Sequence, residues 1–206
     1  MFIEMLDGLR CVADHPRIPL VIAITERDDR FVVEGTMGCP VCRREYPIRG
    51  GVAWFTAEAE RGESEPLRPT DEEGAIRAAA FLGVSDGATV ALVGNWAEHA
   101  TALAELVSLR AYAVNPRVAM GESERVGVVH SGSRLPFADA TLSGVAIADP
   151  AWTDDDVEMA ARALMAGGRM VAPVTARMPG DIVEIARDAS IWVGEKRSPL
   201  VALHRR

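Results

Sequence analysis

Three cysteines, all within the first 42 residues, carry the clearest chemical signal in the sequence. Cys39 and Cys42 are separated by two residues, and two thiolates at this spacing can bind one tetrahedral Zn²⁺ from a tight turn. Cys11 precedes them on the far side of an expected β-hairpin and can supply a third ligand. An odd number of cysteines does not indicate a disulfide framework. The cluster predicts a structural zinc site, which has no open coordination position.

Two residues compete for the fourth position of this site. Asp14 gives a Cys-x2-Asp spacing from Cys11, and His15 gives Cys-x3-His. Softness favours the neutral imidazole as a partner for thiolate-bound zinc, whereas spacing favours Asp14. Both alternatives stay open at the level of sequence. The metal-free interpretation is that both are turn residues beside free, buried cysteines.

A second set of candidate residues follows predicted strands further along the chain. Gly94, Asn115 and His130 each come directly after a short apolar run. The carboxyl ends of parallel strands form the ligand crevice of open α/β sheets. A glycine there lets the backbone approach a cofactor, but Gly94 is the one glycine of its loop and Trp96 brings a large ring beside it. Asn115 offers a neutral amide at this edge, which is a weaker hydrogen-bond acceptor than a carboxylate.

The helices and strands that must position these residues belong to two regions of the chain that differ in sequence pattern. Residues 1–57 indicate a small β-rich domain, residues 58–72 a polar linker, and residues 73–206 an α/β domain of alternating helices and strands, hence a three-layer parallel sheet. The expected strands are Pro19–Ile24, Arg30–Gly35, Tyr46–Phe55, Thr89–Val93, Ala111–Val114, Val126–Val129, Leu142–Ala148, Arg169–Val174, Ile191–Val193 and Leu200–Leu203, with a hairpin turn at Glu26–Asp29. The expected helices are Ile3–Leu9, Glu73–Leu82, Glu98–Leu109, Thr153–Met165 and Asp181–Ala189.

Two of these elements carry a specific local signal. Thr153 can cap its helix while Asp156 stands three residues on, an acidic variant of the capping box. The last two expected strands have only Gly194–Pro199 between them, and so short a connection predicts a C-terminal antiparallel hairpin.

The N-terminal segment resembles the small zinc-ribbon family of methyltransferase activators, which serve tRNA, rRNA and release-factor methyltransferases. The resemblance rests on "LDGLRCVADHPRIPLV" and "GCPVCRREYPIRGGVAWF", which cover nearly all of residues 1–57. Asp14 stands where the family pattern has its second cysteine. The resemblance implies zinc held by Cys11, Cys39 and Cys42, and docking of the ribbon on a methyltransferase.

Residues 73–206 resemble class I S-adenosylmethionine-dependent methyltransferases. The matching stretches are "SRLPFADATLSGVAIADPAW" and "AARALMAGGRMVAPV". The resemblance implies a Rossmann-like sheet and an S-adenosylmethionine site built from Gly94, Asn115 and His130. Amino-group methyltransferases carry Asp/Asn-Pro-Pro-aromatic after the fourth strand, and Asp149-Pro150-Ala151-Trp152 makes Asp149 and Trp152 catalytic candidates.

Composition narrows the function classes. The net charge of −8 and pI of about 5.1 argue against broad nucleic-acid binding, although they leave room for a local basic patch. No apolar run is long enough to span a membrane and no signal peptide is evident, so we expect a cytoplasmic protein. The favoured hypothesis is a non-catalytic methyltransferase-like protein that acts in interaction or regulation. The alternatives are an active N-methyltransferase and an activator of a separate methyltransferase, with another methyltransferase or a second copy as partner.

Overall fold

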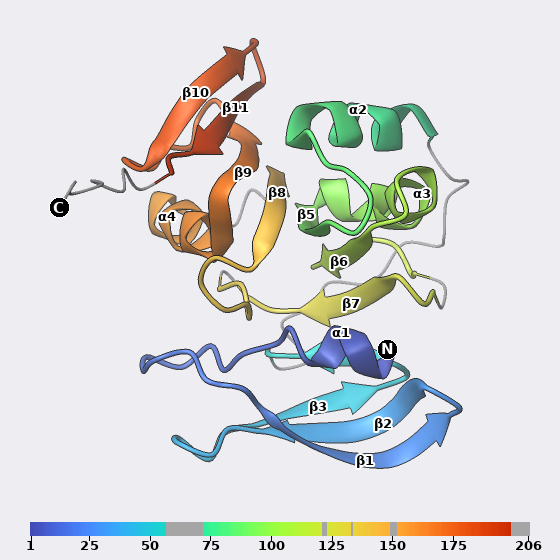
Figure 1. Cartoon of the computed structure of the whole chain (residues 1–206). Helices are drawn as coiled ribbons and strands as arrows, with labels where there is room; N and C mark the ends of the chain where they lie inside the picture. The colour runs from blue at the N-terminus through green and yellow to red at the C-terminus, as the bar shows by residue number, and fades with distance from the viewer. Residues whose placement is uncertain (57–71, 121–122, 133, 149–151, 199–206) are drawn as a thin grey trace, which may run out of the picture.

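The computed structural model describes residues 1–56, 72–120, 123–132, 134–148 and 152–198 (Figure 1). Its strands form one sheet in the order β1-β2-β3-β4-β7-β6-β5-β8-β9-β11-β10. No helix in these ranges is long and apolar enough to cross a membrane. The strands are β1 Val21–Asp28, β2 Phe31–Gly38, β3 Glu45–Arg49, β4 Val52–Trp54, β5 Thr89–Gly94, β6 Arg110–Val114, β7 Val126–His130, β8 Leu142–Ala148, β9 Leu164–Pro173, β10 Ile182–Arg187 and β11 Ile191–Lys196. The helices are α1 Ile3–Leu6, α2 Glu72–Leu82, the 3₁₀-helix η2 Asn95–His99, α3 Ala100–Leu106 and α4 Asp154–Ala163.

The centre of the sheet is parallel and its two ends are antiparallel. Strands β4, β7, β6, β5, β8 and β9 run parallel to one another, whereas β4 pairs with β3 and β9 with β11 in antiparallel. Counted from β5, the order β7-β6-β5-β8-β9 is 3-2-1-4-5, the order of doubly wound Rossmann-type sheets. The fold is therefore a mixed α/β sheet, as the alternation of helices and strands predicts.

Strand β5 shows why the central strands of the sheet have apolar sequences. Val90 and Leu92 contribute to the hydrophobic cluster under α2 and α3, whereas Ala91 and Val93 contribute to the cluster on the opposite face. Because successive side chains point to opposite faces, a strand covered on both sides must be apolar at every position. Helices α1 and α4 supply Met5, Leu6 and Val157 to that second cluster, which completes three layers.

The first fifty-six residues are part of the same sheet. Strand β4 pairs in parallel with β7, with Ala53 opposite Val129. Leu9 forms an antiparallel bridge with Phe137 in the loop before β8. One cluster of buried side chains contains residues from both regions of the sequence.

The expected helix Asp181–Ala189 is wrong: the segment forms the edge strand β10. Its β-branched residues Ile182, Val183 and Ile185 suit a strand, and only Ile182 is buried. Asp188 then makes a tight turn, because its carboxylate accepts hydrogen bonds from the amides of Ser190 and Ile191 at 2.6 and 2.9 Å. An Asx-type turn of this kind joins antiparallel strands, so β10 pairs with β11.

Other boundaries also differ from expectation. The turn of the first hairpin lies at Asp29–Arg30 and not at Glu26–Asp29. Strand β1 continues through two register irregularities and stays paired with β2 as far as Asp28. Strand β9 begins at Leu164, so α4 is shorter than expected. The expected last strand, Leu200–Leu203, lies outside the described residues.

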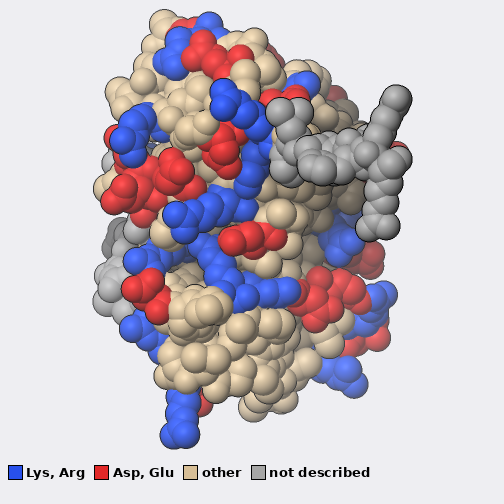
Figure 2. All heavy atoms as spheres, turned by 60° about the vertical axis from the view of Figure 1, so that its left-hand side comes forward, with Lys and Arg blue, Asp and Glu red and all other residues tan. Residues whose placement is uncertain are grey.

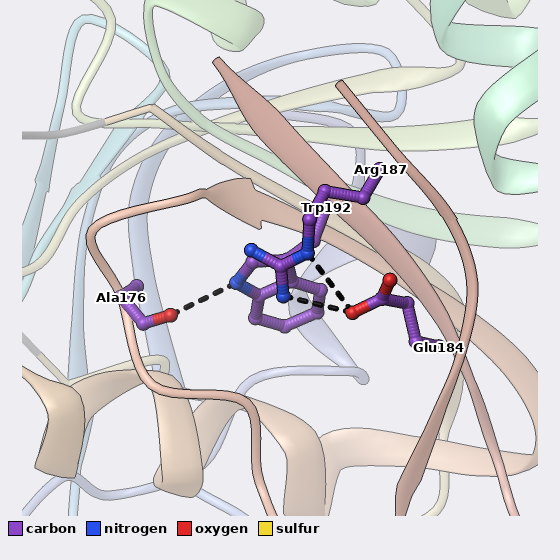
Figure 3. A network of polar contacts seen from close by, with 4 residues as sticks. All are labelled: Ala176, Glu184, Arg187 and Trp192. Atoms are coloured by element: carbon purple, nitrogen blue, oxygen red, sulfur yellow. Dashed lines mark hydrogen bonds and ion pairs between the residues drawn. The ribbon is translucent and has the colours of Figure 1, made fainter. Parts of the chain in front are cut away.

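Trp192 anchors the C-terminal strands to the loop that follows β9 (Figure 3). Its side chain is fully buried in β11, and its indole N–H donates to the carbonyl oxygen of Ala176 at 2.9 Å. On the neighbouring strand β10, Arg187 pairs with Glu184 at 2.8 Å on the exposed side. The loop between β9 and β10 is also held by α4, because the carboxylate of Asp154 accepts from the amide of Arg177 at 2.8 Å.

Candidate metal centre and sheet-edge residues

Cys11, His15, Cys39 and Cys42 lie together although they come from two separate segments. Their candidate ligand atoms all lie within 4.8 Å of one another. Cys39 and Cys42 occupy the turn between β2 and β3, where the amide of Arg43 donates to the carbonyl oxygen of Cys39 at 2.9 Å. Cys11 and His15 come from the N-terminal segment that follows α1.

The distances in this cluster suit a tetrahedral metal ion. The Sγ atoms of Cys11 and Cys42 are 3.6 Å apart, and the Sγ of Cys39 lies 3.4 Å from the Nε2 of His15. Zn–S and Zn–N bonds of about 2.3 and 2.0 Å at the tetrahedral angle predict ligand–ligand edges of roughly 3.5–3.8 Å. A Cys3His set is a zinc-type donor set, so these residues would hold a structural zinc ion.

Outer contacts orient two of the four side chains. The Nδ1 of His15 lies 2.7 Å from the carbonyl oxygen of Pro16, which places the proton on Nδ1 and leaves Nε2 as the lone-pair donor. The hydroxyl of Tyr46 lies 3.1 Å from the Sγ of Cys11. Tyr46 belongs to the Tyr-Pro-Ile stretch of the resemblance, but sequence reasoning gave it no role at the metal site.

The turn also favours thiolates at Cys39 and Cys42. Burial raises the pKa of Cys39, but hydrogen bonds from the backbone amides of Cys42 and Val41 outweigh it and leave the pKa below its usual value. The backbone amide of Arg44 lowers the pKa of Cys42. Burial raises the pKa of Cys11. Thiolates are the forms that bind metal, so the turn is suited to the first two ligands.

Asp14, the other candidate for the fourth position, lies outside the cluster. Its side chain is exposed and lines hollows beside Arg134. The sequence left Asp14 and His15 as alternatives, and the structure brings His15 to the cysteines.

The candidate cofactor residues lie at the carboxyl ends of their strands, as expected, but they are engaged within the chain. The Oδ1 of Asn115 accepts from the amide of Ser131 at 2.9 Å, and its Nδ2 donates to the carbonyl oxygen of Gly132 at 3.2 Å. His130 is 5% exposed and stacks on Trp54 of β4, with ring centroids 4.5 Å apart. The end of β7 is therefore covered by the N-terminal part of the chain.

Trp96 is a core residue. Its side chain is 8% exposed and contacts the rings of Phe81 and His99 in edge-on geometry. The indole thus packs toward α2, and the expectation that it occupies the space beside Gly94 has no support in these contacts. Gly94 adopts a φ of 65°, and η2 begins at the next residue.

Of the catalytic candidates, only Trp152 lies within the described residues. It packs partly buried against the cluster that includes Val157, and its Nε1 is buried without a hydrogen-bond partner in the described structure. Asp149 lies outside those residues, together with Pro150 and Ala151.

No protein-family model and no curated protein sequence matches the chain. Solved structures with similar backbones include a Haloferax volcanii complex between the Trm112 methyltransferase activator and a protein described as a methyltransferase. The two chains are 23% identical, the match covers 48% of this chain and 50% of that chain, and the TM-score is 0.40. A second is a protein described as a methyltransferase from an antibiotic biosynthesis pathway of Anabaena variabilis, with 18% identity over 51% of this chain and 46% of that chain and a TM-score of 0.42. A third is a Geobacter sulfurreducens S-adenosylmethionine-dependent methyltransferase in complex with S-adenosylhomocysteine, with 17% identity over 51% of this chain and 49% of that chain and a TM-score of 0.39. The chain spans about half the length of these structures.

Proposed function

We propose that this chain is a non-catalytic, methyltransferase-like protein with a zinc-bearing, activator-type module docked on its own α/β sheet, and that it acts through protein interaction. The observation that carries the proposal is the state of Asn115. Both polar ends of its side chain are bonded to the backbone after β7. Each end therefore keeps only one free hydrogen-bonding position for a ribose, and a neutral amide offers a weaker acceptor than a carboxylate.

The loop after β5 supports the same conclusion. A cofactor-binding loop at this switch point needs glycines so that the backbone can approach the ligand. Gly94 is followed by Asn95 and by the buried Trp96, which is fixed against Phe81. The loop is therefore built as part of the core and not as a cradle.

Pairing between β4 and β7 supports docking within the chain. Val52, Ala53 and Trp54 are registered against Val128, Val129 and His130. An activator that served a separate methyltransferase through this strand would need its edge free. The cis arrangement therefore favours an integral module over an activator that acts in trans.

Calorimetry with S-adenosylmethionine and S-adenosylhomocysteine tests the proposal. We expect no saturable heat for the natural chain or for the Asn115→Asp variant, which restores an acidic acceptor. The proposal would be contradicted if the natural chain bound either ligand with micromolar affinity and the Asn115→Ala variant bound it more weakly. Elemental analysis of the same preparation should find one zinc per chain.

One observation favours the catalytic alternative, an N-methyltransferase that uses Asp149 and Trp152. The buried indole N–H of Trp152 has no acceptor in the described structure, and such a donor is available to a ligand. If S-adenosylmethionine binds, a methyl-transfer assay tests this second function. Activity in the natural chain that is lost in the Trp152→Phe variant would establish it.

A further inference from the structure

Arginines from three separate segments line one hollow between the N-terminal loop, the loop before β8 and α4. Arg17, Arg134 and Arg162 surround a volume of about 230 Å³. A second hollow of about 340 Å³ shares Arg134 with the first and adds Arg44. Figure 2 shows basic side chains gathered in a band across the middle of the face that carries the left-hand side of Figure 1, with acidic side chains on either side.

Positive charge is in excess at this site although the chain as a whole is acidic. The acidic residues that line the two hollows are Asp14 and Asp139, against four arginines. Within the part of the chain that the structure describes, Arg17, Arg134 and Arg162 form no ion pair. Gathering like charges in this way costs free energy that a bound anion would offset.

Arg17 is also held in place. One of its terminal nitrogens donates to the carbonyl oxygens of Leu135, at 2.8 Å, and Phe137. A guanidinium has five N–H groups, so the remaining donors of Arg17 stay available to a ligand. Arg134 donates to the carbonyl oxygen of Val12 at 3.3 Å, and Arg162 is exposed. The three guanidinium groups line one small space.

We propose that this hollow, here called the arginine hollow, binds a phosphate group. A guanidinium fork matches the oxygens of phosphate bidentately, and a tetrahedral phosphate has enough oxygens to accept from several forks at once. The adjoining hollow with Arg44 and Phe55 leaves room for the remainder of a phosphate ester. The phosphate belongs either to a small free molecule or to a nucleic-acid strand, and the site goes beyond the function proposed above.

Titration calorimetry of the full chain with sodium pyrophosphate tests the proposal. We expect saturable binding that weakens roughly tenfold in the Arg134→Gln/Arg162→Gln double variant, since it removes two charged hydrogen-bond donors from the hollow. The control is the Arg110→Gln/Arg187→Gln double variant, which removes the same charge from exposed positions outside the hollow. Arg17 is left unchanged because it bonds the backbone, and thermal melts verify that both variants fold.

A second titration, with a fluorescein-labelled single-stranded oligonucleotide, identifies the source of the phosphate. Binding tighter than that of pyrophosphate, falling with salt and lost in the Arg134/Arg162 variant, would assign the site to a nucleic-acid backbone. Pyrophosphate binding without tighter oligonucleotide binding would assign it to a small phosphate ester. The proposal is overturned if neither probe saturates, or if the Arg134/Arg162 variant binds as well as the control variant.

Discussion

His15 differs from its neighbour Asp14 in what surrounds the donor atom. The imidazole Nε2 approaches the Sγ of Cys39, and the other ring nitrogen is held by the carbonyl oxygen of Pro16. A histidine fixed in this way presents its lone pair in one orientation, which strengthens it as a ligand. Asp14 is exposed and has no such support.

The two neighbours make a matched pair of variants. We expect His15→Ala to lower zinc affinity by at least tenfold and Asp14→Ala to leave it nearly unchanged, because outer-shell and ligand losses typically cost 10- to 100-fold. Competition with a chromogenic zinc chelator measures both affinities. Equal losses, or a greater loss in Asp14→Ala, would remove His15 from the site.

At the residue scale, the metal centre was predictable only in part from sequence. The spacing of Cys39 and Cys42 is a local property of one turn, so the sequence shows it directly. The choice of His15 depends on the path of the chain from Cys11 to Pro16, which the sequence left open. The engagement of Asn115 by the backbone of Ser131 depends on a loop sixteen residues away, and no local pattern contains it.

At the scale of elements, the free backbone groups at the two ends of α4 find their hydrogen-bond partners in different ways. At its start, the hydroxyl of Thr153 accepts from the amide of Asp156 while the carboxylate of Asp156 accepts from the amide of Thr153 at 2.7 Å, which confirms the predicted capping box. At its end, the ammonium of Lys196 donates to the carbonyl oxygens of Ala161 and Leu164 at 2.7 and 2.8 Å. The contacts of Lys196 join β11 to the end of the helix, and no local sequence pattern predicts them.

Lys196→Met should therefore destabilise the chain by about 1–2 kcal/mol, because it removes a charged donor and leaves helix-end carbonyls without it. The methionine keeps most of the apolar stem, so the loss reflects the ammonium. Urea unfolding followed by circular dichroism measures the change. Arg197→Gln, at an exposed neighbour, should change the free energy of unfolding by less than about 0.5 kcal/mol. An equal loss in both variants would mean that the cap contributes nothing.

Elements buried on both faces were the most predictable ones. Thr89–Gly94 and Leu142–Ala148 are apolar at nearly every position, because helices cover both sides of the sheet there. Strand β10 is an edge strand with five of its six residues exposed, so its composition carries no such constraint. Its spacing of Ile182 and Ile185 also fits a helix, and only pairing with β11 decides between the two.

At the scale of the whole molecule, contacts between residues far apart in sequence join the part that carries the candidate metal site to the central sheet. The buried hydroxyl of Tyr112 on β6 donates to the carbonyl oxygen of Met5 at 2.6 Å. Any side chain at Gly8 would collide with that hydroxyl, so the close approach of α1 to β6 requires glycine there. Arg17 adds its bonds to the loop before β8. The domain boundary at residues 57–73 stays a prediction, but these contacts favour cooperative unfolding of the two parts.

Removing a bound metal should therefore weaken more than the turn that carries Cys39 and Cys42. We expect a zinc chelator to lower the midpoint of one shared thermal transition, and to speed hydrogen exchange at the amides of β7 as well as those of β2 and β3, because β4 transmits the loss directly to β7. His15→Ala is the control, since a chain that holds little zinc should respond little to the chelator. If instead β2 and β3 lose protection while β7, β6 and β5 keep theirs, the metal stabilises only its own turn and the two parts unfold independently.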